Sequence, residues 1–212
     1  MQYIEDISLC FIHIPKTGGT FIERQLQFMN RDLFNNNRFF GGHFTYTMFK
    51  RKLKNIDSYN IFYVIRNPYC RIISAYFYLL NKVKNPTDAH IHEWRHLGSP
   101  SSLSELIINL YSQRNQIRGV HVIPQYKFVI KRNNKDLHKK NILKYENLQE
   151  DFNTFLMKYK KNISVHNYLH KNISLKIKPK KYNIKQYLST QDIQYINEIY
   201  KEDFIQFNYE FQ

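Results

Sequence analysis

The chain of 212 residues contains few cysteines, and this scarcity excludes two classes of protein. Its two cysteines, Cys10 and Cys70, could form at most one bridge, and neither lies at metal-ligand spacing. A disulfide scaffold and a zinc finger are therefore excluded. We expect both residues to be reduced, partly buried thiols.

Long hydrophobic runs are also missing. The amino terminus has an acidic start and an apolar run of only six residues before Pro15, too short for a signal-peptide core or a membrane span. Nowhere else do about 18 apolar residues follow one another. We therefore expect a protein that is soluble as encoded and has no membrane anchor, and its compartment stays open.

Acidic residues are scarce: 17 Asp and Glu stand against 32 Lys and Arg, which leaves a net charge of +15. This excess implies an anionic partner such as a nucleic acid, an acidic membrane surface, a nucleotide or a polyanionic glycan, because net charge governs association. The chain is also poor in Ala and Gly and rich in Asn, Ile and Lys, as translation from an AT-rich genome would produce. Both explanations of the charge stay open here.

A hydrophobic content of 42% supplies the material for a core, so disorder and collagen-like repetition are excluded. Strand and helix patterns alternate along the chain. Strands are predicted at Leu9–Ile14, Arg38–His43, Asn60–Ile65, Lys127–Ile130 and Asn141–Tyr145. Helices are predicted at Phe21–Met29, Phe44–Arg51, Pro68–Leu80, Leu103–Leu110, Leu148–Tyr159 and Thr190–Phe204. Asn81–Pro100 is expected to be irregular or partly helical, and Lys160–Lys181 loop-like. The alternation predicts an α/β domain with a mostly parallel sheet.

A glycine loop follows the first predicted strand, with the sequence Lys16-Thr17-Gly18-Gly19-Thr20. Between a buried strand and a helix, such a loop gathers backbone N–H groups and the positive helix end around one point, which attracts phosphate or sulfate. The nucleotide-triphosphatase motif, which a nucleotide kinase would need, has its lysine after the glycines, whereas Lys16 precedes them. The two glycines could also form a tight turn only.

Five segments, in order along the chain, resemble carbohydrate sulfotransferases of the heparan-sulfate 2-O type. FIHIPKTGGT resembles their 5′-phosphosulfate loop, and VIRNPYCRIISAY is similar to their 3′-phosphate element, where Ser74 follows Arg66 by eight residues. VIPQYKF, ILKYENLQEDF and IYKEDFIQFNYEF resemble the Pro-Gln segment, the next strand and helix, and the closing aromatic end. The resemblance implies a P-loop-like three-layer α/β fold with a central parallel sheet flanked by helices, in a single sulfotransferase domain over 1–212.

The resemblance also implies a donor, 3′-phosphoadenosine 5′-phosphosulfate (PAPS), whose product is adenosine 3′,5′-bisphosphate (PAP). The 5′ end would be cradled by Lys16, Thr17, Gly18, Gly19 and Thr20. Arg66 and Ser74 would hold the 3′-phosphate, a role suited to the fork-shaped, permanently charged guanidinium. Arg71 is a weaker candidate and could equally be a surface cation. Asn67 stands where relatives often carry an acidic residue.

Two residues are expected to carry the chemistry of sulfuryl transfer. Lys16 can neutralise charge on the departing 5′-phosphate. His43 is the expected base, because it follows a predicted strand at Gly41-Gly42 and relatives place a catalytic histidine there. Alternatively, His43 could cap the helix after it. His13 is expected to pack or hydrogen-bond beneath the loop, and no metal is expected.

Two other functions compete with this assignment. His92-Glu93-Trp94-Arg95-His96 matches the H-E-x-x-H signature of zinc-dependent hydrolases, although the flanking prolines and glycine leave room for only two or three helical turns. His90, His92, Trp94, Arg95 and His96 are instead expected to line the acceptor channel or to lie on a solvated loop. The charge also suggests a basic nucleic-acid-binding module, but no fold signature accompanies it and no nucleic-acid partner is expected. The expected acceptor is a hydroxyl on a carbohydrate, with an acidic glycan among the options; tyrosine hydroxyls and small alcohols stay open as other acceptors.

Overall fold

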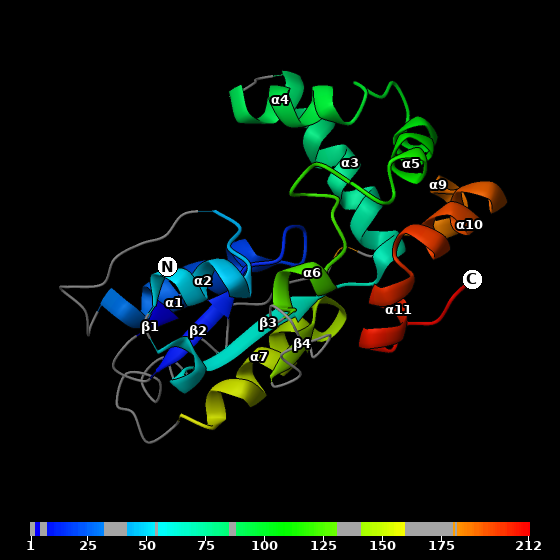
Figure 1. Cartoon of the computed structure of the whole chain (residues 1–212). Helices are drawn as coiled ribbons and strands as arrows, with labels where there is room; N and C mark the ends of the chain where they lie inside the picture. The colour runs from blue at the N-terminus through cyan, green and yellow to red at the C-terminus, as the bar shows by residue number, and fades with distance from the viewer. Residues whose placement is uncertain are drawn as a thin grey trace. The chain divides into compact units, whose positions relative to one another are not determined.

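The computed structural model describes residues 3–4, 8–31, 42–53, 55–84, 88–130, 141–159, 180 and 182–212 (Figure 1). The chain divides into two compact units. The first unit comprises Met1–Ile65 and Phe128–Lys180, and the second comprises Arg66–Lys127 and Lys181–Gln212. Each unit has a hydrophobic core of its own.

The described part of the first unit is built on a four-stranded sheet of β1 (Tyr3–Ile4), β2 (Leu9–Ile12), β3 (Asn60–Ile65) and β4 (Ile142–Lys144), in that order. β2, β3 and β4 are parallel, and β1 runs antiparallel to β2. Parallel pairing aligns Ile12 with Tyr63, so the carboxyl ends of β2 and β3 meet at one edge of the sheet. The predicted α/β class with a mostly parallel sheet is confirmed.

One face of this sheet is covered by α1 (Gly19–Arg31) and α7 (Leu148–Met157). Successive side chains of a strand alternate between faces, so Leu9 and Phe11 share a face. Ile22 and Leu26 of α1 and Phe152, Phe155 and Leu156 of α7 join the same core. Figure 1 shows α1 beside β2 and α7 beside β4. Each fully buried apolar side chain of this size contributes roughly 1.5–3 kcal/mol, so this core fixes the strand ends from which the loops emerge.

The first unit also contains α2 (Tyr46–Lys52) and two short 3₁₀ turns, η1 (Ile56–Ser58) and η2 (Tyr145–Asn147). The short helix α6 (Tyr126–Val129) includes the chain position at which the second unit passes into the first. Buried Cys10 and half-buried Cys70 are not joined to each other or to another cysteine by a disulfide, as the sequence predicts.

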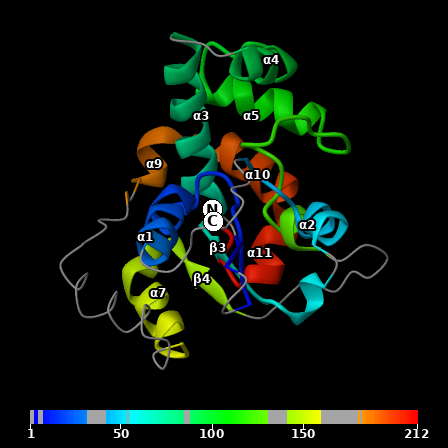
Figure 2. The ribbon, with the colours of Figure 1, turned by 90° about the vertical axis from the view of Figure 1, so that its left-hand side faces the viewer.

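The described part of the second unit is helical and is organised around α3 (Pro68–Lys84), which α4, α5, α9 and α10 contact (Figure 2). The other helices are α4 (Asp88–His96), α5 (Leu103–Ser112), α9 (Ile184–Tyr187), α10 (Thr190–Ile199) and α11 (Lys201–Phe207). α3 starts with Pro68, whose missing N–H costs nothing in a first turn. The Asn67 Oδ1 accepts hydrogen bonds from the N–H groups of Tyr69 (3.0 Å) and Cys70 (3.3 Å) and so caps the helix.

Several element predictions are wrong. The apolar run Lys127–Ile130 is not a strand, because Tyr126–Val129 forms helix α6; short apolar runs do not distinguish the two structures by period. Thr190–Phe204 is not one helix, since Tyr200 leaves helical geometry at φ −109° and ψ 20° between α10 and α11. The stretch Asn81–Pro100 is more helical than expected, because α3 continues to Lys84 and α4 follows.

Two predicted segments fall largely outside the described residues. Residues 38–41 of the predicted strand Arg38–His43 lie outside them, and Gly42 and His43 are not in a strand. The loop predicted at Lys160–Lys181 lies outside them except for Lys180.

Candidate functional site

The glycine loop lies directly after β2, with turns over residues 15–18 and α1 beginning at Gly19. Lys16 adopts a φ of 67°, in the left-handed region that residues with a Cβ atom rarely enter. Such conformations persist where surrounding structure imposes them, and they cluster at ligand sites. Thr17 is fully buried, and its Oγ1 donates to the Ile14 carbonyl at 2.9 Å. The Thr17 hydroxyl therefore shapes the loop.

Both loop glycines are required by close packing. Gly18 has a φ of +87°, and a Cβ atom there would lie 2.7 Å from Leu148 Cδ2. A Cβ atom on Gly19 would lie 2.0 Å from His13 Cδ2, far inside van der Waals contact. The glycines thus do more than make a tight turn, because they let the loop and the start of α1 lie directly on His13 and α7.

His13 is buried beneath this loop, as the sequence predicts. Its side chain stacks on Phe11 with ring centroids 5.7 Å apart, and its Nδ1 lies 3.0 Å from Glu23 Oε1 of α1. The ion pair or hydrogen bond with Glu23 ties the end of β2 to the first turns of α1. His13 is therefore a support for the loop.

His43 lies against the same support. Its Nδ1 is 3.2 Å from the His13 carbonyl oxygen, and the two imidazole rings meet edge to face with centroids 4.5 Å apart. A carbonyl only accepts hydrogen bonds, so Nδ1 donates to it, and a neutral His43 ring would carry its lone pair on Nε2. The structure thus brings His43 to the end of β2 where the glycine loop begins.

The alternative in which His43 caps the following helix is wrong. Helix α2 begins at Tyr46, and its N-cap is Thr45, whose Oγ1 accepts from the Met48 N–H at 3.3 Å. The predicted start at Phe44 was two residues early. With Thr45 in the capping position, the His43 side chain is directed by its bond to His13.

In the second unit, Arg66 directly follows β3 and is 3% exposed. Its guanidinium lies 5.5 Å from the centroid of the Tyr182 ring, within the range of a cation–π interaction. Ser74, half-buried, lies on α3 six residues after Pro68, a rise of about 9 Å along the helix.

Arg71 is not a surface cation, because its side chain is 2% exposed. Its Nη1 donates to the Ile123 carbonyl at 3.0 Å and its Nη2 to the His121 carbonyl at 3.2 Å. The guanidinium therefore fixes the segment before α6 to α3.

The model of the Sulfotransferase family matches residues 3–210, nearly the whole chain. The chain belongs to this family. It is an enzyme that transfers a sulfuryl group to an acceptor. No curated protein and no solved structure matches the chain.

The H-E-x-x-H segment of this sulfotransferase forms most of α4, and its carboxylate has a structural partner. Glu93 accepts from the His121 N–H at 2.9 Å, and its Oε2 lies 2.7 Å from His121 Nδ1. Burial alone would raise the pKa of Glu93, but the hydrogen bonds and charge of His121 outweigh it and hold the pKa below the ordinary value. His96 Nδ1 donates to the His92 carbonyl at 2.7 Å. In the part of the chain that the structure describes, no group of three or more His, Cys, Asp or Glu could hold a metal ion.

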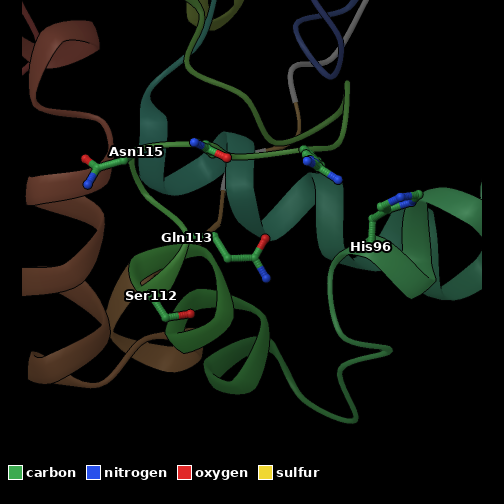
Figure 3. Close-up of a pocket in the computed structure, with 6 residues that line it drawn as sticks. His96, Ser112, Gln113 and Asn115 are labelled. Atoms are coloured by element: carbon green, nitrogen blue, oxygen red, sulfur yellow. The ribbon is translucent and has the colours of Figure 1, made fainter.

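A polar groove of about 520 Å³ lies between the end of α4 and the residues after α5 in the sulfotransferase. It is lined by His96, Ser112, Gln113, Asn115, Gln116 and Arg118. Figure 3 shows the side chains of His96, Ser112, Gln113 and Asn115 around it. A second hollow of about 470 Å³ shares His96 and Arg118 with this groove and extends to His90 and His121.

Trp94 was expected to line an acceptor channel, and this prediction is wrong. The Trp94 side chain is 8% exposed and packs in the core of the second unit, 6.2 Å from the Tyr76 ring. Of the five residues expected there, His90 and His96 line these hollows.

The sequence interpretation missed Gln125 and Asp203 of this enzyme, both fully buried in the second unit. The Gln125 carboxamide bonds to the Arg66 main chain, and Asp203 bonds to Gln125. In the sequence, the segment VIPQYKF stands out only through its resemblance to the Pro-Gln segment of the family. A buried amide and a buried carboxylate are visible as partners only in three dimensions.

No helix among the described residues is long and apolar enough to cross a membrane.

Proposed function

We propose that the enzyme takes its sulfuryl group from PAPS and transfers it to a hydroxyl of a carbohydrate by in-line displacement, with His43 as base. The observation that carries this proposal is the contact of His43 with His13, which itself lies directly beneath the loop that contains Lys16. A base and a cationic anion-binding loop at the end of one strand are the two groups that sulfuryl transfer needs.

Donor binding is assigned to two elements. The turn at residues 15–18, the start of α1 and the Lys16 ammonium would hold the 5′ end, through Lys16, Thr17, Gly18, Gly19 and Thr20. Arg66 and Ser74 would hold the 3′-phosphate, as the resemblance implies. The residue types suit the anion: the start of α1 and the Lys16 ammonium supply positive charge for the 5′ end, and the permanently charged Arg66 guanidinium suits the 3′-phosphate. When bound, PAPS supplies a sulfur atom whose bond to the 5′-phosphate oxygen can break.

The proposed chemistry follows from the tautomer of His43. Its Nδ1 proton is held by the His13 carbonyl, so Nε2 accepts the proton of the acceptor hydroxyl as that oxygen bonds to sulfur. Lys16 neutralises the charge that grows on the departing 5′-phosphate. His43 then returns its proton to solvent or to the product phosphate.

A carbohydrate acceptor is supported by the polar groove. Side-chain amides both donate and accept hydrogen bonds, which suits sugar hydroxyls, and Arg118 with His96 would favour a carboxylate or sulfate on the sugar. The net charge of +15 agrees with an acidic glycan. We propose this groove as the acceptor-binding surface.

The test measures PAP formation from PAPS over a panel of neutral and acidic glycans, together with PAP binding by calorimetry. His43→Ala should keep the wild-type affinity for PAP and lose about 10²–10⁴-fold in turnover, the usual contribution of a general base. Met48→Ala, an exposed change on the neighbouring α2, is the matched control and should turn over normally. Undiminished turnover in His43→Ala would rule out this histidine as the base.

A further inference from the structure

We propose that Gln125 is a positioning residue for the donor site, acting through the main chain of Arg66. This inference rests on the proposed function, because it assigns to Arg66 the recognition of a 3′-phosphate. It concerns how the enzyme sets the direction of that guanidinium.

The Gln125 carboxamide pairs with both main-chain groups of Arg66. Its Oε1 accepts from the Arg66 N–H at 2.9 Å, and its Nε2 donates to the Arg66 carbonyl at 2.9 Å. These are the two bonds that a neighbouring strand would offer. β3 ends at Ile65, so the side chain extends the pairing by one residue beyond the strand. The two bonds thereby fix the Arg66 backbone, and with it the direction in which the side chain extends.

The orientation of the Gln125 amide is itself fixed. Asp203 Oδ2 accepts from the Gln125 N–H at 2.8 Å and lies 3.5 Å from Gln125 Nε2. The carboxylate and the Arg66 carbonyl both require the NH₂ end of the amide, and the Arg66 N–H requires the oxygen. A flipped amide would break all three bonds, so only one arrangement is compatible with the site.

The segment that carries Gln125 is anchored on both sides. Asp203 Oδ1 accepts from the Tyr126 N–H at 2.8 Å, and the Tyr200 hydroxyl donates to the Val122 carbonyl at 2.7 Å. The Arg71 guanidinium holds the carbonyls of His121 and Ile123. Groups from α3, Tyr200 and α11 therefore hold the segment, and Gln125 transmits that rigidity to Arg66.

A positioning role and a purely stabilising role would affect the binding of different ligands. PAP carries the 3′-phosphate, and adenosine 5′-monophosphate lacks it. If the Arg66 side chain loses its orientation, the affinity for PAP should fall and the affinity for the monophosphate should stay unchanged. A general loss of stability would weaken the binding of PAP and of the monophosphate alike. The ratio of the two dissociation constants is therefore the readout.

The experiment titrates PAP and adenosine 5′-monophosphate into wild type, Gln125→Met and Gln125→Glu. Met retains the volume of Gln without its hydrogen bonds, and the preference for PAP should fall about tenfold, the value of one charge-assisted hydrogen bond. Glu keeps the shape and the bond to the Arg66 N–H, but it loses the donor and places a second carboxylate beside Asp203, so its preference for PAP should fall as well. Gln206→Ala, on α11 with a side chain bonded to Glu202, is the control and should match wild type.

The outcomes separate the two claims. A wild-type enzyme that does not prefer PAP contradicts the proposed function. A wild-type preference that persists unchanged in Gln125→Met and Gln125→Glu overturns the positioning role alone. Should Gln125→Met fail to fold, the Gln125→Glu ratio decides by the same criterion.

Discussion

Asp203 shows how one buried side chain can connect the stability of the fold to the proposed donor site. Its carboxylate is fully buried and accepts from the N–H groups of Gln125 and Tyr126. Burial raises the pKa of Asp203 to about 6, and this effect outweighs the opposing influence of Arg71 and the hydrogen bonds. The residue therefore titrates within an accessible pH range.

This shift predicts a pH-dependent stability. Between the ordinary pKa of 3.8 and about 6, the folded protein holds a proton on Asp203 that the unfolded chain has released. Stability from this residue is thus fully present below about pH 4 and decreases as the pH rises to about 6. Relative to Asp203→Asn, wild type should lose on the order of 3 kcal/mol over that interval. Chemical denaturation at several pH values measures the difference.

Glu210→Gln, a change at an exposed carboxylate, is the control for Asp203→Asn and should follow the wild-type pH profile. Parallel profiles for wild type and Asp203→Asn would contradict the raised pKa.

The residue types expected at the site were partly predictable from sequence. Arg66, Ser74, Lys16 and the two glycines stand in local motifs, whereas the strand predicted up to His43 is not what places it, because Gly42 and His43 are not in a strand. Its bond to the His13 carbonyl could not be anticipated, since 30 residues separate the two. The burial of Arg71 was missed for the same reason: its partners lie 50 and 52 residues away.

At the scale of elements, the start of α10 is fixed by a capping box. The Ser189 Oγ accepts from the Asp192 N–H at 3.1 Å, and Asp192 Oδ2 accepts from the Ser189 N–H at 2.9 Å. The same carboxylate accepts from Ser104 Oγ of α5 at 2.8 Å. A serine followed three positions later by an acidic residue is a local signal, so this cap belongs to the features that the sequence can carry.

Ser189→Ala should lower the free energy of unfolding by about 1 kcal/mol, because it removes one cap acceptor and one donor to Asp192. Denaturant unfolding measures the loss. Thr154→Ala, at an exposed position within α7, should change the free energy little and is the matched control. An equal effect of the two substitutions would show that the capping box does not stabilise α10.

Elements with a strong period or a long apolar run were predicted well. β3 has the predicted bounds Asn60–Ile65, and α3 starts at the predicted Pro68. The strand prediction for Lys127–Ile130 is wrong because four apolar or basic residues show no periodicity. Tertiary contacts such as that of Asp203 with Tyr126 hold the segment as a helix.

At the scale of the whole molecule, the family match over residues 3–210 covers both units. The α/β class follows from the alternation of strands and helices, and the family follows from short segments in a fixed order. The network of Arg66, Gln125 and Asp203 spans three distant parts of the chain, so no local pattern predicts it. The assignment of 1–212 to one sulfotransferase domain stays a prediction.

Calorimetric titration of PAP into wild type and into the double variant Lys16→Ala, Arg66→Ala tests the central claim most directly. We expect binding at one site per chain in wild type, with an affinity that falls at least about a hundredfold in the double variant because two charged contacts are lost. Absence of binding to wild type at millimolar PAP, or equal affinity in both proteins, would contradict it.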